Sequence, residues 1–478
     1  MNYIGVEFDQ QAAALLSPSD YQNPTPKDRY HLVVIGAGPA GLISAIGAAG
    51  LGANVALIER HRMGGDCLNV GCVPSKALLE YTGHARADFD EAFHHLRKIR
   101  ADIAPHDSVE RYSELGVDVF LGDASFNAQG KVQVGDVLFN TRRVAICTGA
   151  RASLPPIPGL DQCDALTNET LFDLVNCPAS IGILGAGAIG CEMATVFARL
   201  GVEVHLFELA DRVLPLEAPA ASQTVAEALQ KLGVTLHLGA GVAAIEPGTP
   251  HVIKAEQSVQ VEKILVALGR APNTESLQLA NAGIETNPRG QILTDAKLRT
   301  SNKQVYAAGD CTTNPQFTHS ADAQARVLVQ NTLIAPTASV AGFVTPRCTY
   351  TSPEVASIGH SEATANEQGI AYETLEFDLG ELDRGRTRVQ APGYVQVLLK
   401  PGTDKMIGAS IVDSDAGELI SPLCLMMSNG IGLGAAVKTQ LPYPTRSEFL
   451  KRLGDAYNRT RVTPMVSKIF ATWLKVFK

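Results

Sequence analysis

A glycine-rich turn between two apolar strands occurs twice in this chain, and this repeat constrains the fold more than any other feature. In each unit an apolar strand runs into the turn, a helix follows, and a second strand ends at an acidic residue. The repeated positions are Gly36, Gly38, Gly41 and Glu59 in the first unit, and Gly185, Gly187, Gly190 and Glu208 in the second. Each position of the second unit follows its counterpart by 149 residues (185 − 36 and 208 − 59). This order of elements is typical of a dinucleotide-binding βαβ unit, so the repeat predicts an α/β chain with two nucleotide-binding domains.

The residue types in each unit fit the binding of a dinucleotide. The first glycine makes the turn, the second lets the backbone approach the pyrophosphate, and the third lets the helix pack against the strand. The acidic residue at the end of the second strand accepts hydrogen bonds from a ribose.

A second motif lies in residues 64–76, where Cys67 and Cys72 are separated by four residues. Pro74 suits the first turn of a helix, so we expect Cys72 at or just before a helix N-terminus. The helix dipole and Lys76, one turn further on, favour a thiolate at Cys72. The motif predicts a reversible, functional disulfide. The alternatives are a structural disulfide or a zinc site, but zinc would need two further ligands at metal spacing, and none follow, so no metal is predicted.

Two further predicted strands are each followed by a glycine and a polar residue. Residues 144–147 predict a buried strand that ends at Thr148 and Gly149, and residues 305–308 predict another that is followed by Asp310. Asp310 either caps a turn or binds near a ribityl hydroxyl or a phosphate, and the local pattern leaves both interpretations open.

The two ends of the chain differ from the middle. Residues 6–16 predict a short helix and the proline-containing residues 17–26 a tether, so we expect an N-terminal extension that lies on a neighbouring domain. Strand-like stretches at 349–356 and 393–399 and a helix-like stretch at 416–427 predict a separate α+β domain.

Composition excludes several classes of protein. The net charge of −9 argues against nucleic acid as a main partner. Most of the nine cysteines are scattered without motif spacing, which indicates free thiols in a reducing compartment. Neither a secretory signal nor an apolar stretch long enough to cross a bilayer is predicted, so we expect a cytoplasmic protein.

On these motifs, residues 31–450 resemble the class I pyridine nucleotide–disulfide oxidoreductases, which include glutathione reductase, dihydrolipoamide dehydrogenase and mercuric reductase. The resemblance implies two Rossmann-like domains, a C-terminal α+β dimerisation domain and a homodimer. The implied division is an extension at 1–30, an FAD-binding domain at 31–177 and 292–343, an NAD(P)H-binding domain at 178–291, a dimerisation domain at 344–458 and a C-terminal helix at 459–478.

The resemblance also implies roles for individual residues. The first glycine turn would bind FAD, with Glu59 on the adenosine ribose and Asp310 near the ribityl–pyrophosphate portion. Cys72 would face the flavin and Cys67 would attack the substrate. The further cofactor-binding positions are Gly65, Lys76, Thr148, Gly149 and Gly269. Lys76 and Glu192 match a family ion pair beside the flavin.

The second glycine turn would bind the nicotinamide nucleotide. An acidic residue at Glu208 accepts the 2′-hydroxyl and would repel a 2′-phosphate, so NADH is favoured. Arg212, four residues further on, leaves NADPH as the alternative.

Two departures from the family pattern concern the acceptor. Tyr443 occupies the position of the acid–base histidine of the disulfide reductases, while Glu448 of that motif is retained. A phenol is a poor base at neutral pH compared with an imidazole. Mercuric reductase also has a tyrosine there, but its C-terminal cysteine pair is missing, because no cysteine follows Cys424.

The last twenty residues form a separate pattern. Residues 459–478 contain five basic residues and no acidic residue, and Met465, Ile469, Trp473 and Phe477 recur at helical spacing. This pattern predicts a basic amphipathic helix, which associates with a membrane surface or, alternatively, packs on the dimerisation domain.

Taken together, these features predict an FAD-dependent NAD(P)H oxidoreductase that passes electrons to the Cys67–Cys72 disulfide and on to a disulfide or metal–thiolate. One alternative is reduction of quinones or dyes by the flavin. The other is an electron-transfer subunit that the C-terminal helix docks to a membrane.

Overall fold

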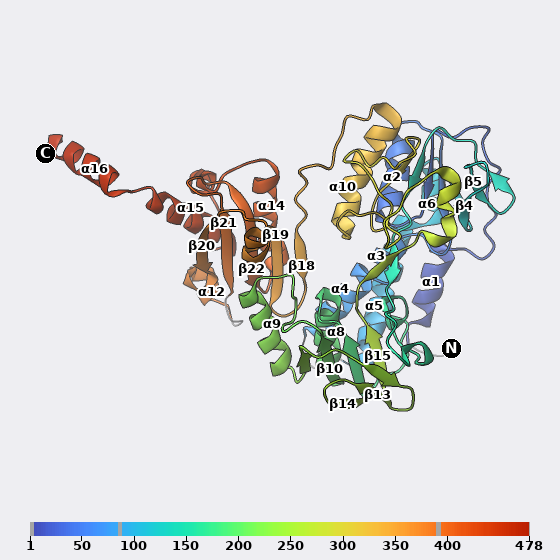
Figure 1. Cartoon of the computed structure of the whole chain (residues 1–478), viewed down its shortest axis with the longest axis horizontal. Helices are drawn as coiled ribbons and strands as arrows, with labels where there is room; N and C mark the ends of the chain where they lie inside the picture. The colour runs from blue at the N-terminus through green and yellow to red at the C-terminus, as the bar shows by residue number, and fades with distance from the viewer. Residues whose placement is uncertain (1–3, 85–87, 389–392, 478) are drawn as a thin grey trace. The chain divides into compact units, whose positions relative to one another are not determined.

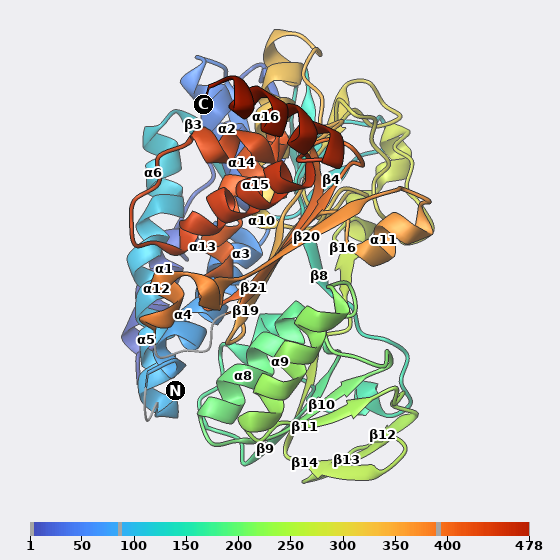
Figure 2. The same cartoon turned by 90° about the vertical axis from the view of Figure 1, so that its left-hand side faces the viewer.

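The computed structural model describes residues 4–84, 88–388 and 393–477 (Figure 1, Figure 2). The chain divides into two compact units. Unit 1 comprises Met1–Gly185, Val196–Phe207 and Ala240–Gly342, and unit 2 comprises Ala186–Thr195, Glu208–Gly239 and Phe343–Lys478. The fold is mixed α/β, as the sequence predicts.

A five-stranded parallel sheet lies in unit 1. Its strands are, in spatial order, β17 (Val305–Ala307), β7 (Val144–Ile146), β1 (Leu32–Ile35), β2 (Val55–Glu59) and β3 (Val117–Leu121). Every residue of β1 and β2 is buried, because both faces of the sheet are covered. Helices α2 (Pro39–Gly50) and α10 (Thr318–Val329) pack side by side on one face (Figure 1). The antiparallel strands β4 (Ala124–Phe126), β5 (Val132–Val134) and β6 (Val137–Leu138) contribute to the core on the other face.

The second βαβ unit forms another parallel sheet. Strand β9 (Ser180–Leu184) pairs with β10 (Glu203–Glu208) and with β15 (Lys263–Val266), and α8 (Ala188–Arg199) follows β9. Strands β12 (Ala244–Glu246), β13 (His251–Lys254) and β14 (Ser258–Val261) form an antiparallel sheet. Strands β8 (Ala150–Ala152) and β16 (Arg270–Pro272) form an antiparallel pair.

An antiparallel sheet of five strands forms the centre of the C-terminal part of unit 2. The order is β18 (Arg347–Thr349), β19 (Glu354–Gly359), β22 (Met406–Asp413), β21 (Tyr394–Leu399) and β20 (Glu373–Asp378). Helices α13 (Ala416–Leu419), α14 (Ser421–Ser428) and α15 (Phe449–Thr460) cover one face of this sheet, where the apolar core lies (Figure 2).

The remaining elements complete the described residues, and strand β11 (Thr235–Leu238) extends the sheet of β9, β10 and β15 beside β10. The helices are α1 (Val6–Leu16), α3 (Gly65–Asn69), α4 (Cys72–Thr82), α5 (Phe89–Ile103), α6 (Val109–Glu114), α7 (Asn168–Leu171), α9 (Pro219–Lys231), α11 (Glu362–Glu367), α12 (Asp383–Arg386) and α16 (Pro464–Val476), and the one further strand is β11 (Thr235–Leu238). Short 3-10 or π segments lie at Ala104–Asp107, Leu160–Gln162, Glu275–Leu277, Leu279–Ala282, Gln330–Ile334, Leu379–Glu381, Leu433–Lys438 and Arg446–Glu448.

Two expectations about the C-terminal domain are wrong in detail. The stretch 349–356 is not one strand, because the chain turns between β18 and β19, where Pro353 has no N–H to give to a ladder. The stretch 416–427 is not one helix but two, α13 and α14, and Pro422 occupies the first turn of α14.

Candidate functional site

Residues 64–76, which we call the cysteine loop, pack directly on the first glycine turn. Gly64 has φ of 90° and donates its N–H to the carbonyl of Ala37 at 2.9 Å. Gly65 has φ of 57°, and a Cβ added there would lie 2.5 Å from Cα of Gly38. The two motifs, almost thirty residues apart in the sequence, therefore form one site, and Gly65 is required for their close approach.

The two cysteines lie at the junction of helices α3 and α4. Helix α4 begins at Cys72, as the position of Pro74 predicts, with Gly71 as its N-cap. The Cys72 thiol lies 3.5 Å from the hydroxyl of Thr318, the first residue of α10. Two helix N-termini therefore meet at this sulfur, and both favour negative charge there. No local pattern in the sequence marks Thr318, which comes from a distant part of the chain.

The two cysteines differ in burial, because Cys67 is half-buried and Cys72 is exposed. A hydrogen bond to the Cys72 thiol, together with burial, raises the pKa of Cys67 well above the ordinary range. The Cys67 thiol therefore holds its proton more tightly than an ordinary cysteine does.

The first glycine turn has the geometry of a dinucleotide cradle. Gly36 has φ of 100°, and a Cβ there would overlap the carbonyl of Cys147, while a Cβ on Gly41 would overlap the carbonyl of Gly36. The carboxylate of Glu59 accepts hydrogen bonds from backbone N–H groups at 2.8 Å and 2.7 Å, those of Ala37 and His61. Burial raises the pKa of Glu59 above its ordinary value, against the lowering effect of these bonds.

The second glycine turn repeats this geometry. Gly185 has φ of 101°, and Gly190 is buried in α8. A Cβ on Gly187 would meet no atom within 4 Å, so open space lies in front of this residue. Glu208 accepts hydrogen bonds from the N–H groups of Ala186 at 2.8 Å and Ala210 at 3.0 Å.

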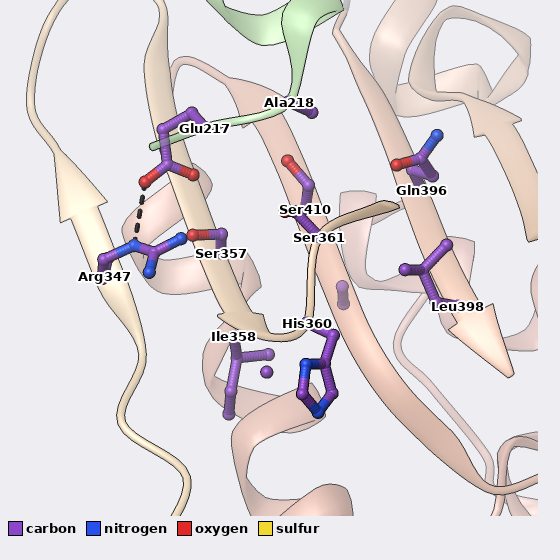
Figure 3. A pocket seen from close by; sticks show the side chains of 12 residues that line it. Glu217, Ala218, Arg347, Ser357, Ile358, His360, Ser361, Gln396, Leu398 and Ser410 are labelled. Carbon is purple, nitrogen blue, oxygen red and sulfur yellow. Dashed lines mark hydrogen bonds and ion pairs between the residues drawn. The ribbon is translucent and has the colours of Figure 1, made fainter. Parts of the chain in front are cut away.

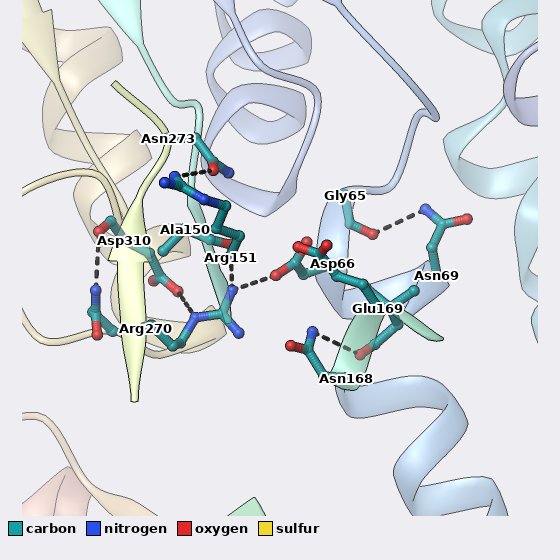
Figure 4. A network of polar contacts seen from close by, with 12 residues as sticks. Gly65, Asp66, Asn69, Ala150, Arg151, Asn168, Glu169, Arg270, Asn273 and Asp310 are labelled. Atoms are coloured by element: carbon teal, nitrogen blue, oxygen red, sulfur yellow. Dashed lines mark hydrogen bonds and ion pairs between the residues drawn. The ribbon is translucent and has the colours of Figure 1, made fainter. Parts of the chain in front are cut away.

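An arginine that the sequence analysis did not single out joins the cysteine loop to the strand ends. Arg270, at the start of β16, lies between the carboxylates of Asp66 and Asp310 and pairs with both (Figure 4). Its Nε lies 3.4 Å from Asp310, and its Nη2 donates to Asp66 and, at 2.6 Å, to the carbonyl of Ala150. Burial raises the pKa of Asp310, while the charge of Arg270 lowers it. In the sequence, Arg270 directly follows Gly269, which is one of the predicted cofactor-binding positions. In the structure Gly269 has φ of 112°.

The same network includes the end of β7. Asn273 donates its N–H to the carbonyl of Gly149 at 3.0 Å and its side-chain amide to the carbonyl of Thr148 at 3.1 Å. A Cβ on Gly149 or on Gly269 would meet no atom within 4 Å. Thr148, Gly149, Gly269 and Asp310 are therefore brought together beside the cysteine loop, and the open glycine surfaces leave room for a flat cofactor such as FAD.

The remaining predicted residues belong to other elements. Lys76 lies half-buried on α4, one turn beyond Cys72. Glu192 is buried on α8 and accepts a hydrogen bond from the N–H of Tyr350 at 3.0 Å. The ion pair between Lys76 and Glu192 stays a prediction.

Tyr443 lies on the surface of unit 2, with 71% of its surface exposed. Its hydroxyl donates to Asp383 at 2.7 Å, and this hydrogen bond raises the pKa of the phenol above its ordinary value. Glu448 pairs with Arg452 at 2.9 Å.

A small cavity in unit 2 is distinct from this site (Figure 3). It is lined by Ser357 and Ser410, which face each other on β19 and β22, and by Gln396, Arg347 and Glu217. Its volume of about 10 Å³ accommodates a single water molecule rather than a substrate.

The described residues contain neither a metal-binding cluster nor a membrane-spanning helix. Within residues 4–84, 88–388 and 393–477, no group of three or more His, Cys, Asp or Glu side chains is arranged to hold a metal ion. No helix in this part of the chain has the length and apolar character needed to cross a membrane.

Comparisons with known proteins find relatives over most of the chain. Residues 30–325 match the family model described as pyridine nucleotide-disulphide oxidoreductase, and residues 345–453 match the dimerisation domain of that family. The chain is 32% identical over 444 residues to mercuric reductase from Staphylococcus aureus, which covers 88% of this chain and 81% of that protein. It is 30% identical over 449 residues to dihydrolipoyl dehydrogenase 3 from Haloarcula marismortui, which covers 87% of this chain and 94% of that protein.

A solved structure is similar over most of the chain. The Cu(II) complex of the HOCl-induced flavoprotein disulfide reductase RclA from Escherichia coli has a TM-score of 0.83 and 29% sequence identity. The match covers 90% of this chain and 100% of that chain.

Proposed function

Because the chain belongs to the pyridine nucleotide-disulphide oxidoreductase family, whose members bind FAD and use NAD(P)H, we propose that it passes electrons from NAD(P)H through FAD to the Cys67–Cys72 pair. The contact between Gly65 and Gly38 carries this proposal, since it holds the cysteine loop against the first dinucleotide turn. The dimerisation domain supports a homodimer.

Bound FAD supplies two-electron exchange between a nicotinamide and a dithiol. In the proposed reaction, the reduced Cys67 attacks an acceptor disulfide and releases the first thiol. Cys72 then attacks Cys67, which releases the second thiol and restores the Cys67–Cys72 disulfide. Overall, NAD(P)H, one proton and a disulfide give NAD(P)⁺ and two thiols.

The acceptor that we propose is a disulfide or a metal–thiolate. We include metal–thiolates among the proposed acceptors for two reasons. Some relatives are named mercuric reductase, and a related disulfide reductase forms a Cu(II) complex. NADH is the proposed reductant, because the Glu208 carboxylate stands at the end of β10, where a 2′-phosphate would be repelled. Lys76 and Glu192 are proposed as the ion pair that assists the flavin.

An anaerobic titration with NADH, and then NADPH, tests the proposal. We expect a long-wavelength absorption band, which arises when the Cys72 thiolate lies against the oxidised flavin. Bleaching of the flavin without this band would overturn the proposal and favour reduction of quinones or dyes. The Cys67→Ser variant separates the two activities, because it should abolish reduction of disulfides and leave the reduction of dyes unchanged.

We further propose that the cytoplasmic enzyme associates with an anionic membrane surface through α16. None of the described residues of this helix is buried. Most of its large apolar side chains are more than half exposed, including Ile469 at 57% and Trp473 at 56%. The basic residues of 459–478 complement anionic lipid headgroups, whereas pairing with a second copy of the same helix would bring like charges together.

Sedimentation with lipid vesicles tests this association. We expect the full chain to sediment with phosphatidylglycerol vesicles but not with phosphatidylcholine vesicles, and to be released by high salt. The Trp473→Glu variant should stay in solution, and Leu425→Glu, at an exposed apolar residue of α14, is the matched control. Absence of binding by the full chain would overturn the proposal, as would a change of oligomeric state in Trp473→Glu without a change in vesicle binding.

A further inference from the structure

We propose that Asp9, in the N-terminal extension, is a positioning residue that holds the cysteine loop in place through Arg100 and Asn69. The inference rests on the proposed role of the Cys67–Cys72 pair as a redox couple. It gives a function to the N-terminal extension, residues 1–30, for which the sequence alone predicts no function.

The first link is an ion pair between α1 and α5. Asp9 on α1 pairs with Arg100 and, at 3.3 Å, with the Nε of Arg97. The side chains of both arginines are only 2% exposed. A buried guanidinium is costly unless it is paired and hydrogen-bonded, so these arginines require the carboxylate that the N-terminal extension provides.

The second link runs from α5 to the cysteine loop. Arg100 Nη1 donates to the carbonyl of Asn69, the last residue of α3, at 3.0 Å. The side-chain amide of Asn69 donates in turn to the carbonyls of Met63 at 3.0 Å and Gly65 at 2.9 Å. Asn69 therefore joins both ends of the short helix that carries Cys67, and Arg100 fixes Asn69.

A third contact attaches the extension to the start of the same loop. The carbonyl of Leu16, at the end of α1, accepts a hydrogen bond from the N–H of Met63 at 3.1 Å. Leu16 is fully buried and Ala12 is 3% exposed, so α1 is anchored by apolar packing as well as by charge. The extension thus contacts the loop directly through Leu16 and indirectly through Asp9.

The expected consequence concerns the equilibrium between the disulfide and the two thiols. Reduction of the Cys67–Cys72 disulfide consumes two electrons and two protons, and the disulfide is favoured when the sulfurs are held close together. Without the Asp9 carboxylate, Arg100 loses its buried ion pair and no longer holds the carbonyl of Asn69 in place. Helix α3 is then less tightly fixed. The two sulfurs then separate more readily, so the disulfide becomes easier to reduce and Cys67 more accessible.

The test compares the purified holoenzyme with its Asp9→Asn variant. We expect the dithiol-to-disulfide ratio in a fixed glutathione buffer to rise about tenfold, which corresponds to about 30 mV in midpoint potential. We also expect faster alkylation of Cys67 by iodoacetamide in the reduced enzyme. The Asp9→Glu variant, which keeps the charge, should restore most of both properties.

Two matched controls change neighbouring contacts only. Asn23→Ala removes the paired hydrogen bonds between the extension and the backbone of Leu121 on β3, and it leaves Asp9, Arg100 and Asn69 unchanged. Asp173→Asn removes the second carboxylate near Arg100, which lies at 3.6 Å and is 60% exposed. Both should leave the ratio and the alkylation rate unchanged.

A second variant, at Asn69, tests the inference if Asp9→Asn does not fold. Asn69→Ala keeps the arginines paired and should give the same shift, and the double variant should shift no further than either single variant. An unchanged ratio and alkylation rate in Asp9→Asn or Asn69→Ala would overturn the inference. If the wild type forms no Cys67–Cys72 disulfide, the proposed function fails, and the alkylation rates alone decide the role of Asp9.

Discussion

Glu59 and Glu208, which are 149 residues apart, perform the same structural task in the two βαβ units. Each carboxylate accepts two backbone hydrogen bonds, one from the residue after the first glycine and one from the residue two positions beyond the acid. Each acid therefore fixes the glycine turn of its own unit, and a remaining lone pair on its oxygens is available for a ribose hydroxyl.

Removing the charge of Glu208 should change the choice of nicotinamide. In Glu208→Gln the side chain keeps its size and one acceptor oxygen, and thus one of its two backbone hydrogen bonds, but it no longer repels a 2′-phosphate. We expect the ratio of kcat/KM for NADPH to that for NADH to rise about tenfold, which corresponds to about 1.4 kcal/mol. Steady-state kinetics with both nucleotides measure this ratio. Glu203→Gln, on an exposed residue of the same strand, is the control, and an unchanged ratio in Glu208→Gln would mean that this carboxylate does not face the ribose.

A methyl group on Gly187 should weaken nicotinamide binding without damage to the fold. A Cβ there enters open space, and this space is where the second glycine of the motif admits a pyrophosphate. We expect Gly187→Ala to raise KM for the preferred nucleotide about tenfold, while its flavin content and melting temperature stay unchanged. In the control, Gly50→Ala, the Cβ also enters open space, but it lies at the end of α2 and should not change KM.

Loss of Arg270 should shift the pH dependence of activity. Burial raises the pKa of Asp310, and the charge of Arg270 opposes this effect. In Arg270→Gln the pKa of Asp310 therefore rises further, and Asp310 loses its negative charge at a higher pH than in the wild type. We expect the acidic limb of the pH–activity profile to move to higher pH.

The control for Arg270 is its neighbour in the same network (Figure 4). Arg151 pairs with Glu275 at 2.7 Å, and Arg151→Gln should leave the acidic limb where it is. If both variants shift the limb equally, the effect arises from the net charge of the region and not from the pair of Arg270 with Asp310.

The sequence was sufficient for the parts of the site that depend on local geometry. The glycine turns were predictable because positive φ or close backbone approach at Gly36 and Gly185 leaves glycine as the residue that fits. The start of α4 at Cys72 was predictable because Pro74 marks the first turn of a helix.

The long-range contacts were not predictable from one sequence. Arg270 and Asp66 are 204 positions apart, and Asp9 and Arg100 are 91 positions apart. Each of these residues resembles an ordinary surface charge in its local sequence, and only the packing of distant elements makes the pair. The breaks in the C-terminal strand and helix have a local cause, proline, but the apolar patterns there masked it.

The phenol of Tyr443 should not act as a base in the wild-type enzyme. Its hydrogen bond to Asp383 raises its pKa above the ordinary value, so the phenol holds its proton more tightly than an ordinary tyrosine does. We therefore expect Tyr443→Phe to reduce small disulfides within about twofold of the wild-type rate. Tyr443→His, which introduces the imidazole of the disulfide reductases, should raise this rate at least about tenfold near pH 7.5, with a new inflection near the pKa of histidine. A tenfold loss in Tyr443→Phe would instead show that the phenol takes part in proton transfer despite its raised pKa.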